Sequence, residues 1–342
     1  MIPSRKSSTM KEVAAIAGVS IQTVSAIINC KPGISPETSA RVNAAIQQLG
    51  YRPYSLARSL RTRQTHTIAL IVTDINNPSF STIASAVEDI AHSLGYNLVL
   101  FNTHDDPERE ASYIRTVYDR WMDGVIFVAT GDQFTSLDSL KQDGIPTVAI
   151  DRIPMGYSGP SVTLDNFKAG FMAAEYLVSL GHKRIAHISG PLKLLLARER
   201  LAGYQACLKK ANLDPTDFSS PEGDWNCNSG YEGMQQILSG SEIPTAIFAG
   251  NDRMAIGAIQ AIIKKGLRVP EDISVIGLDD IEVAAFQSPA LTTIRQSFPE
   301  MASQCVHLLM EILDGKECLY PQMVIEPELI VRQSTAAPPK TV

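Results

Sequence analysis

The chain has 342 residues, more than one hydrophobic core usually holds, so two or three domains are expected. With 44% hydrophobic and 19% charged residues, the composition is that of a globular protein. The sequence has neither a membrane-spanning apolar run nor an apolar secretory signal, which predicts a cytoplasmic protein with no membrane partner. The net charge of −6 is uneven, because residues 1–63 hold nine Lys and Arg against two Glu, which predicts a polyanionic partner for this basic segment.

Three short helices are expected within the first fifty residues. The capping box Thr9-Met10-Lys11-Glu12 begins the first helix, and Gly18 breaks it. Ser20 caps a second helix that runs to about Asn29, while Ser35 and Pro36 begin a third helix that Gly50 ends. Short helices with a glycine in the first turn are typical of a helix-turn-helix, whose second helix enters the major groove of DNA.

The outer face of the second helix is polar and uncharged. A solvated helix normally has Glu and Lys there, whereas this face has Gln22, Thr23, Ser25 and Asn29. Neutral hydrogen-bonding side chains suit base edges and phosphate oxygens. The face therefore favours a DNA-binding head over the alternative, a generic three-helix unit.

After residue 63, apolar runs alternate with helical segments. The runs predicted as buried parallel strands are 68–72, 98–101, 125–128, 147–150, 185–188, 246–248 and 274–277. The predicted helices are 83–94, 108–121, 169–180, 197–211, 254–265 and, at the end, about 299–313. Such alternation predicts an α/β fold of doubly wound sheets, and seven strands before the last helix indicate two lobes.

Polar residues follow several of these strands at the edge where open α/β sheets bind ligands. They occur at 73–80, 151–152, 250–252 and 279–280, as carboxylates, amides and an arginine with an aromatic ring nearby. This set suits a polyhydroxylated ligand, because carboxylates and amides can bond neighbouring hydroxyl groups. A single Asp at a strand end is more often a cap or a turn residue, the role we expect for Asp252 and Asp280.

The motifs T-M-K-E-V-A-A-I-A-G-V-S-I-Q-T-V-S-A-I-I-N, I-S-P-E-T and L-G-Y-R-P-Y-S-L-A-R-S-L-R resemble the lactose/galactose-repressor family of bacterial transcriptional regulators. The resemblance implies that Ile21, Gln22 and Ala26 contact base edges. Ala26 replaces the family's usual Arg and Tyr54 its usual Asn, so we expect an operator sequence unlike those of relatives. The predicted DNA-binding residues are Thr9, Ser20, Ile21, Gln22, Thr23, Ser25, Ala26, Asn29, Tyr51, Arg58, Leu60 and Arg61.

The segment after the head is too short to form a stable isolated helix. The resemblance implies that it is a hinge helix, which orders on DNA and inserts Leu60 into the minor groove as an apolar wedge. A plain linker with a buried Leu60 is the alternative.

The body shows further motifs of this family in order, among them V-A-I-D-R, G-N-D-R-M-A-I-G-A, V-I-G-L-D-D and L-T-T-I-R-Q. They are most similar to the ribose-repressor and purine-repressor branch, which implies a two-lobed, periplasmic-binding-protein-like (type I) effector domain. In such a domain Arg200 and Asp279 would be a polar pair and Trp225 a stacking ring. The implied effector-binding residues are Asn77, Phe80, Asp151, Arg200, Trp225, Asn251, Asp279 and Gln296.

The expected organisation has four parts. They are the head (1–53), the hinge helix and linker (54–65), the effector-binding and dimerisation domain (66–335) and a disordered tail (336–342). We expect lobe 1 to comprise about 66–160 and 291–320, and lobe 2 about 161–290 and 321–335.

The sequence thus predicts a repressor that binds double-stranded operator DNA as a homodimer under allosteric control by a sugar-like effector. The run Leu194-Leu195-Leu196 replaces a loop that is polar in purine-binding relatives, which favours a sugar over a purine corepressor. A stand-alone sugar-binding protein would have a signal peptide and no basic head. No Ser-His-Asp order, phosphate loop or cluster of metal-binding residues is present, so we expect no catalysis, no cofactor and no metal.

Overall fold

The structure is a computed structural model, and it describes residues 8–29, 31–51, 64–131, 140, 143–216, 218, 220–316 and 322–339. The chain divides into two compact units, Met1–Thr65 and His66–Val342. The predicted hinge helix, with Tyr54, Arg58, Leu60 and Arg61, lies outside the described residues.

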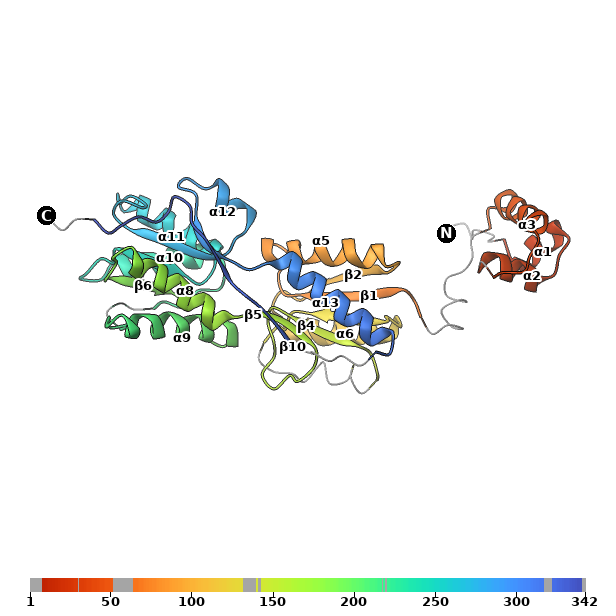
Figure 1. The fold of residues 1–342 in the computed structure, drawn as a ribbon, viewed down its shortest axis with the longest axis horizontal. Helices are drawn as coiled ribbons and strands as arrows, with labels where there is room; N and C mark the ends of the chain where they lie inside the picture. Colours follow the sequence, from red (N-terminus) through yellow and green to blue (C-terminus); the bar gives the residue numbers. More distant parts are fainter. Residues whose placement is uncertain are drawn as a thin grey trace. The chain divides into compact units, whose positions relative to one another are not determined.

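The first unit contains the three predicted helices, α1 (Met10–Ala17), α2 (Ile21–Ile28) and α3 (Pro36–Leu49) (Figure 1). The capping box is present, because the Thr9 hydroxyl accepts from the Glu12 amide and the Glu12 carboxylate accepts from the Thr9 amide. Ser20 and Ser35 cap α2 and α3. The predicted helix-turn-helix is therefore confirmed. Its apolar core consists of Val13, Ala14, Ala17, Val24, Val42, Ala45 and Tyr51.

The first lobe of the second unit is built on a parallel sheet of order β10-β5-β4-β3-β1-β2. Its strands are β1 (Thr67–Val72), β2 (Asn97–Asn102), β3 (Gly124–Phe127), β4 (Thr147–Ile150), β5 (Ser161–Leu164) and β10 (Gln322–Ile325). Alternate residues of β1 serve opposite faces: Ile68 packs with α5 (Pro78–Ser93) and α13 (Phe298–Leu313), whereas Ile71 packs with α6 (Pro107–Asp119). Both faces are thus covered, as an apolar parallel strand requires.

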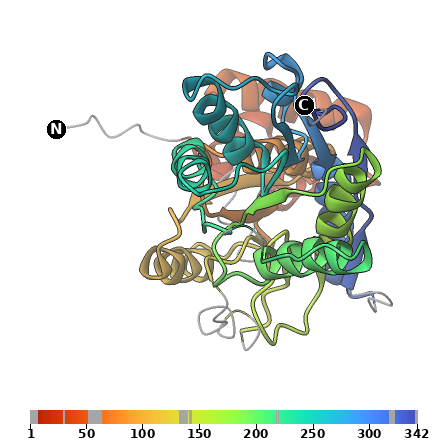
Figure 2. The same ribbon diagram turned by 90° about the vertical axis from the view of Figure 1, so that its left-hand side faces the viewer.

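The second lobe has a sheet of order β11-β9-β8-β7-β6. Its strands are β6 (Ile185–Ile188), β7 (Ala246–Ala249), β8 (Ser274–Asp279), β9 (Thr292–Arg295) and an antiparallel edge strand, β11 (Glu328–Ile330). Two helix layers cover it, as Figure 2 shows. One layer is α8 (Asn166–Ser179) and α9 (Leu195–Lys210), and the other is α10 (Cys227–Leu238) and α11 (Asp252–Lys264), with the short α12 (Glu282–Phe286) beyond them.

The chain crosses between the lobes three times, and each crossing follows a few residues after the predicted boundary. The crossings lie at Asp165, between β5 and α8; at Gln296, between β9 and α13; and at Glu326, between β10 and β11. The predicted boundaries near 160, 290 and 320 therefore assigned β5, β9 and β10 to the wrong lobes. Polar residues interrupt these strands (S-V-T-L, T-T-I-R and Q-M-V-I), so no continuous apolar run revealed them.

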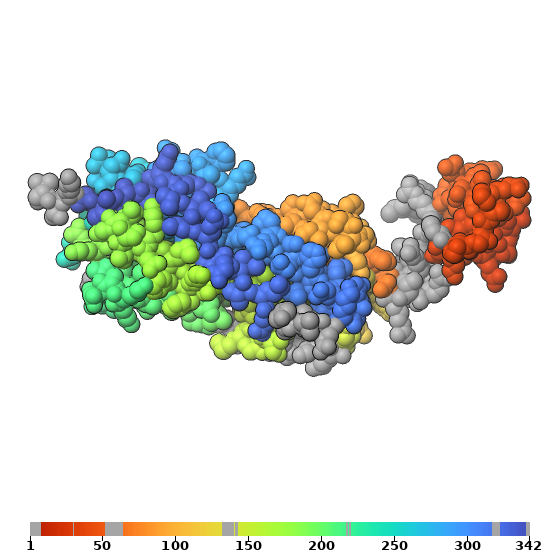
Figure 3. Space-filling view, in the orientation of Figure 1, coloured from red at the N-terminus to blue at the C-terminus, as the bar shows by residue number. Residues whose placement is uncertain are grey.

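The C-terminal segment was expected to be a disordered tail beyond residue 335. Instead, it packs on the second lobe at least as far as Ala336, whose carbonyl bonds His182 Nε2 and whose amide donates to Ser274 Oγ. Figure 3 shows this segment, in dark blue, lying on the surface of the lobe. Pro338 lies within 4 Å of where a Cβ on Gly181 would be, which extends the packed segment two residues further.

Within the described residues no single helix is long and apolar enough to cross a membrane, and α1 and α2 meet that test only as a pair bent by 105°.

Candidate functional site

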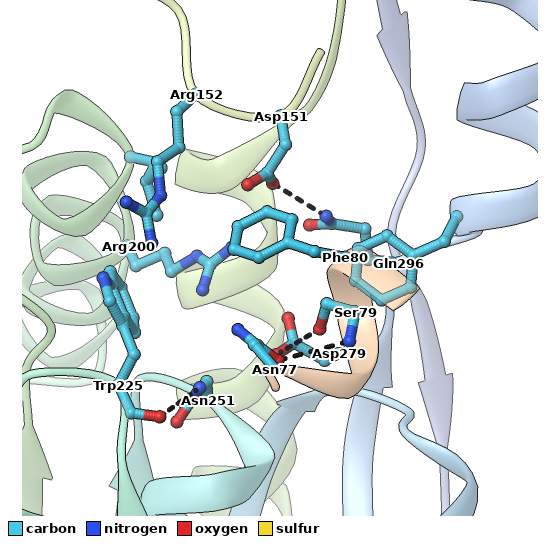
Figure 4. A pocket seen from close by; sticks show the side chains of 12 residues that line it. Asn77, Ser79, Phe80, Asp151, Arg152, Arg200, Trp225, Asn251, Asp279 and Gln296 are labelled. Atoms are coloured by element: carbon cyan, nitrogen blue, oxygen red, sulfur yellow. Dashed lines mark hydrogen bonds between the residues drawn. The ribbon is translucent and has the colours of Figure 1, made fainter. Parts of the chain in front are cut away.

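A small cavity lies between the lobes at the C-terminal ends of the strands (Figure 4). The structure brings all eight predicted effector-binding residues to its wall. Four further lining residues were missed: Ser79 and Arg152, which adjoin predicted positions; Leu196, from the three-leucine run; and Phe298, at the start of α13. The strand-end pattern gave a signal for the first two, whereas only the tertiary structure places Phe298 here.

Two of the lining amides begin helices that point into the cavity. The Asn77 side chain accepts from the Ser79 amide at the start of α5, and the Asn251 side chain accepts from the Met254 amide at the start of α11. The positive ends of these helix dipoles therefore face the cavity from opposite lobes and favour oxygen atoms there. Capping also holds each amide in one orientation.

Arg200 reaches the cavity because α8 and α9 pack unusually close together. A Cβ on Gly170 would lie 2.0 Å from the Arg200 carbonyl oxygen, so only glycine permits this approach. Arg200 Nε donates to Asn166 Oδ1 and Nη1 to the Gly250 carbonyl, both at 2.8 Å. Burial lowers the pKa of the guanidinium, and Asp279 and Asp151 act against that shift. Since a guanidinium stays charged, the cavity holds a fixed positive group.

Two of the aromatic rings that line the cavity, Trp225 and Phe80, each lie under a guanidinium. Arg200 stands over the Trp225 ring with its carbon 5.5 Å from the centroid, and Arg152 stands over Phe80 at 5.4 Å. Arg152 Nη1 also pairs with Asp105 Oδ1 at 2.8 Å. The rings therefore have one face covered by a cation, which fixes their position and limits stacking to the other face.

Asp279 is the second charged group at the cavity, and its surroundings disfavour ionisation. Its side chain is 6% exposed, and its Oδ2 accepts from the Ser79 hydroxyl across the cavity at 3.3 Å. Burial raises the pKa of this carboxyl well above its ordinary value, although Arg200 opposes the shift. A ligand that donates hydrogen bonds would replace water around this carboxylate.

Three lining residues adopt a left-handed backbone without being glycine. Asp151 has φ 64°, Trp225 φ 72° and Asp279 φ 130°. Such conformations cost about 1–3 kcal/mol each and persist where the surroundings impose them. Three of the nine such residues in the described part of the chain line this cavity, which makes it a candidate functional site.

Two buried polar atoms at the cavity lack a partner among the described residues: Trp225 Nε1, a donor, and Gln296 Oε1, an acceptor. The Gln296 amide also donates from Nε2 to Asp151 Oδ1 at 2.9 Å. Unpaired buried groups are costly, so a ligand with hydroxyl groups would stabilise this arrangement.

Neither Asp252 nor Asp280 caps a helix, one of the two roles expected for them, although Asp280 has the left-handed φ of 59° that is typical of a turn residue. Asp252 is fully buried below the cavity and accepts from the Ile281 amide and the Thr293 hydroxyl. Burial raises the pKa of its carboxyl to about 7. Asp280 bonds two arginines, Arg295 at 2.8 Å and Arg332 at 2.5 Å. Both residues join strands of the second lobe instead, contacts between distant segments that sequence spacing does not show.

The predicted DNA-facing surface of α2 is partly open to solvent. Ile21 and Gln22 are exposed, whereas Thr23, Ser25, Ala26 and Asn29 are half-buried. Thr9 and Ser20 are also exposed, with their hydroxyls engaged in capping. Tyr51 lies in the core of the head with 7% exposure, so its ring serves packing.

No group of His, Cys, Asp and Glu side chains suited to a metal ion occurs in the part of the chain that the structure describes. His187 is buried between the rings of Tyr204 and Phe248, and its pKa is lowered to about 4 by burial. This histidine therefore packs as part of the scaffold.

Comparison with known proteins gives matches for both units. Residues 9–54 match the family model "Bacterial regulatory proteins, lacI family", and residues 174–335 match that of a periplasmic binding protein-like domain. The ribose operon repressor of Escherichia coli (strain K12) is 39% identical over 327 residues, covering 95% of this chain and 99% of that protein. The repressor PurR of Haemophilus influenzae (strain PittEE) is 38% identical over 335 residues, covering 95% and 98%.

Among solved structures, the lac repressor dimer bound to operator and the anti-inducer ONPF superposes with a TM-score of 0.87. It is 30% identical in sequence, and the match covers 97% of this chain and all of that one.

Proposed function

This chain belongs to the lacI family of bacterial regulatory proteins, and from that premise we propose that a small uncharged sugar controls its binding to operator DNA. It is a transcriptional repressor with a helix-turn-helix head and an allosteric effector domain. The eight predicted residues around the cavity are proposed as the effector contacts. The observation that carries this proposal is the set of carboxylate, amide and guanidinium groups around one small cavity.

The charge balance supports an uncharged ligand. Two carboxylates, Asp151 and Asp279, face two guanidiniums, and the Arg152 guanidinium is already paired with Asp105. A phosphate or carboxylate ligand would thus meet Asp151, and Asp279 whenever that carboxyl is ionised, with only Arg200 left to neutralise it, which desolvation makes unfavourable. Neutral hydroxyl groups can donate to the carboxylates and accept from Arg200.

The same cavity disfavours a purine, the class of ligand that the similarity to PurR brings into question. Leu196 lines the cavity with a buried apolar side chain. It belongs to the three-leucine run that replaces the polar loop expected of a purine-binding relative. A purine base has ring N–H donors but no hydroxyl groups, so it could donate fewer hydrogen bonds than a sugar to the acceptor positions that Gln296 and Ser79 leave open on Asp151 and Asp279. The relative named for the ribose operon is consistent with a sugar.

We infer a homodimer that holds two heads on a two-fold symmetric operator in the cytoplasm, as the dimeric lac repressor structure on its operator supports. Effector binding changes the arrangement of the lobes and thereby the operator affinity. By linkage, operator DNA must change effector affinity by the same factor. We expect no turnover of the bound sugar.

The test is a ligand panel with two readouts. Operator sites are first selected from random DNA, and D-ribose, other pentoses and hexoses, hypoxanthine and guanine are then titrated by calorimetry. Fluorescence anisotropy with the selected DNA measures how each ligand changes operator affinity. A sugar that binds and shifts operator affinity supports the proposal, whereas a response to nucleobases alone overturns it.

A further inference from the structure

Among the described residues, two side-chain contacts join the lobes at the cleft. Ser79 Oγ donates to Asp279 Oδ2 inside it, and Arg253 Nη1 pairs with Asp74 Oδ2 at 3.5 Å outside it. Asp74 follows β1 in the first lobe, and Arg253 lies in the first turn of α11 in the second lobe. Neither member of the second pair lines the cavity.

Arg253 occupies a position that its own helix disfavours. It is the second residue of α11, where the helix dipole places partial positive charge and a cation is destabilising. The acidic residue before it, Asp252, does not compensate at the surface because its carboxylate is buried and bonded elsewhere. A residue that is unfavourable in its own helix is commonly explained by a tertiary contact, and here Arg253 contacts Asp74.

Hydrogen bonds within a turn fix the orientation of the Asp74 side chain. Its Oδ1 accepts from the Asn76 amide at 3.0 Å, and its carbonyl accepts from the Asn77 amide, so a tight turn fixes the side chain. Oδ2 is thereby directed to Arg253. The Asp74 and Arg253 side chains are 30% and 19% exposed, which leaves the pair only partly screened by solvent.

The pair adjoins the effector cavity on both sides. Asp74 is three residues before Asn77, and Arg253 is two residues after Asn251, and these two amides line the cavity from opposite lobes. Closing the pair therefore brings the two capped helix ends towards each other. Opening it separates them without removing any group that faces the cavity.

We propose that Asp74 and Arg253 form an interlobe latch, a pair of positioning residues that holds the cleft closed around the effector. The latch acts in the empty protein and in the complex, so it slows both opening and effector release. Ser79 and Asp279 differ from it, because both line the cavity and Asp279 is itself a proposed effector contact. That a sugar is the effector rests on the proposed function; the latch itself does not.

A ligand-free experiment tests the latch. Leu196, 7% exposed in the cavity wall, is replaced by cysteine, so that its reaction with a maleimide reports how often the cleft opens. The background carries serine at three of the five native cysteines, Cys30, Cys227 and Cys318, and keeps the buried Cys207 and Cys305. Arg253→Met should raise the labelling rate about two- to fivefold, the size expected for a partly exposed ion pair. Raising NaCl to about 1 M should increase the labelling rate of the parent protein, because salt screens the ion pair, and should leave the labelling rate of Arg253→Met unchanged.

Arg268→Met is the matched control, since Arg268 pairs with Asp272 within the second lobe and its loss should not change the rate. The reversed pair, Asp74→Arg with Arg253→Asp, should return the labelling rate part of the way to that of the parent, because the exchange restores the ion pair but removes the Oδ1 acceptor of the Asn76 amide. Equal rates in Arg253→Met and Arg268→Met, or an equal salt response in the parent and Arg253→Met, would overturn the latch.

A second measurement uses D-ribose as the probe. Stopped-flow dissociation should be about two- to fivefold faster from Arg253→Met than from the wild type. If D-ribose fails to bind the wild type, the choice of sugar under the proposed function is wrong, while the maleimide result still decides the latch. If D-ribose binds and leaves both proteins at the same rate, the latch is overturned.

Discussion

Replacing Asp279 with asparagine removes one negative charge from the cavity while keeping the shape of the side chain. Its Oδ2 accepts from Ser79, while no hydrogen bond to its Oδ1 is recorded among the described residues, so Oδ1 is the oxygen available to a ligand hydroxyl. The amide of Asp279→Asn would keep one acceptor and turn the other into a donor. A hydrogen bond to a charged group contributes about 1.5–3 kcal/mol, so sugar affinity should fall about 10- to 150-fold.

The stability of the protein should change little. Burial raises the pKa of Asp279, which means that its surroundings favour the neutral carboxyl despite the nearby Arg200. A neutral amide should therefore alter the free energy of unfolding by no more than about 1 kcal/mol. Because the ionised carboxylate is the acceptor, wild-type sugar affinity should rise as pH rises through the raised pKa, and Asp279→Asn should lack this rise.

Isothermal titration with the sugar found in the panel, at several pH values, measures the affinities, and urea unfolding measures stability. Asp280→Asn is the matched control: its carboxylate bonds Arg295 and Arg332 and does not line the cavity. That variant should bind sugar within about twofold of the wild type and lose about 3 kcal/mol of stability. Unchanged sugar affinity in Asp279→Asn would refute the assignment of its carboxylate as an effector contact.

Three further predictions concern packing, titration and DNA. Gly203→Ala should lower the free energy of unfolding by about 1–3 kcal/mol in urea, because its Cβ would lie 2.0 Å from the Phe167 carbonyl; wild-type stability would contradict the close approach of α8 and α9. Asp252→Asn should gain stability relative to the wild type as pH rises from about 4 to 7, by at most about 1.4 kcal/mol per pH unit. The reason is that the Asp252 carboxyl of the wild type keeps its proton in the folded state over this range and releases it in the unfolded chain. A stability difference independent of pH would contradict this. Ala26→Arg should change the base preferred at one half-site position by about 1–3 kcal/mol in binding-site selection, whereas an unchanged preference would place Ala26 away from the bases.

The helices of the head could be predicted because their signals are local. Thr9 with Glu12, Ser20, and Ser35 with Pro36 lie within four residues of the amides that they cap, and the structure contains each of these caps. The strands with continuous apolar runs were predicted for a similar reason, since such a run needs two covered faces. Motif order then placed all eight predicted residues at the cavity, including the caps Asn77 and Asn251.

Contacts between distant segments could not be predicted in this way. The strands β5, β9 and β10 contain polar residues and gain their stability from neighbours in the sheet, so their own residues have no distinctive pattern. The Asp74–Arg253 pair joins residues 179 positions apart. Nothing in the sequence near Arg253 identifies its partner, although its unfavourable place at a helix start is visible there.

The sequence by itself therefore determined the basic three-helix head, the alternating strands and helices of the body, and the residue types that surround the cavity. These follow from charge, capping and hydrophobic period, which act over a few residues. Only the tertiary structure decided where the chain crosses between lobes, that Asp252 and Asp280 join strands, and which charges meet across the cleft. Those outcomes depend on which surfaces pack together, because close packing and the burial of charge are properties of the folded chain.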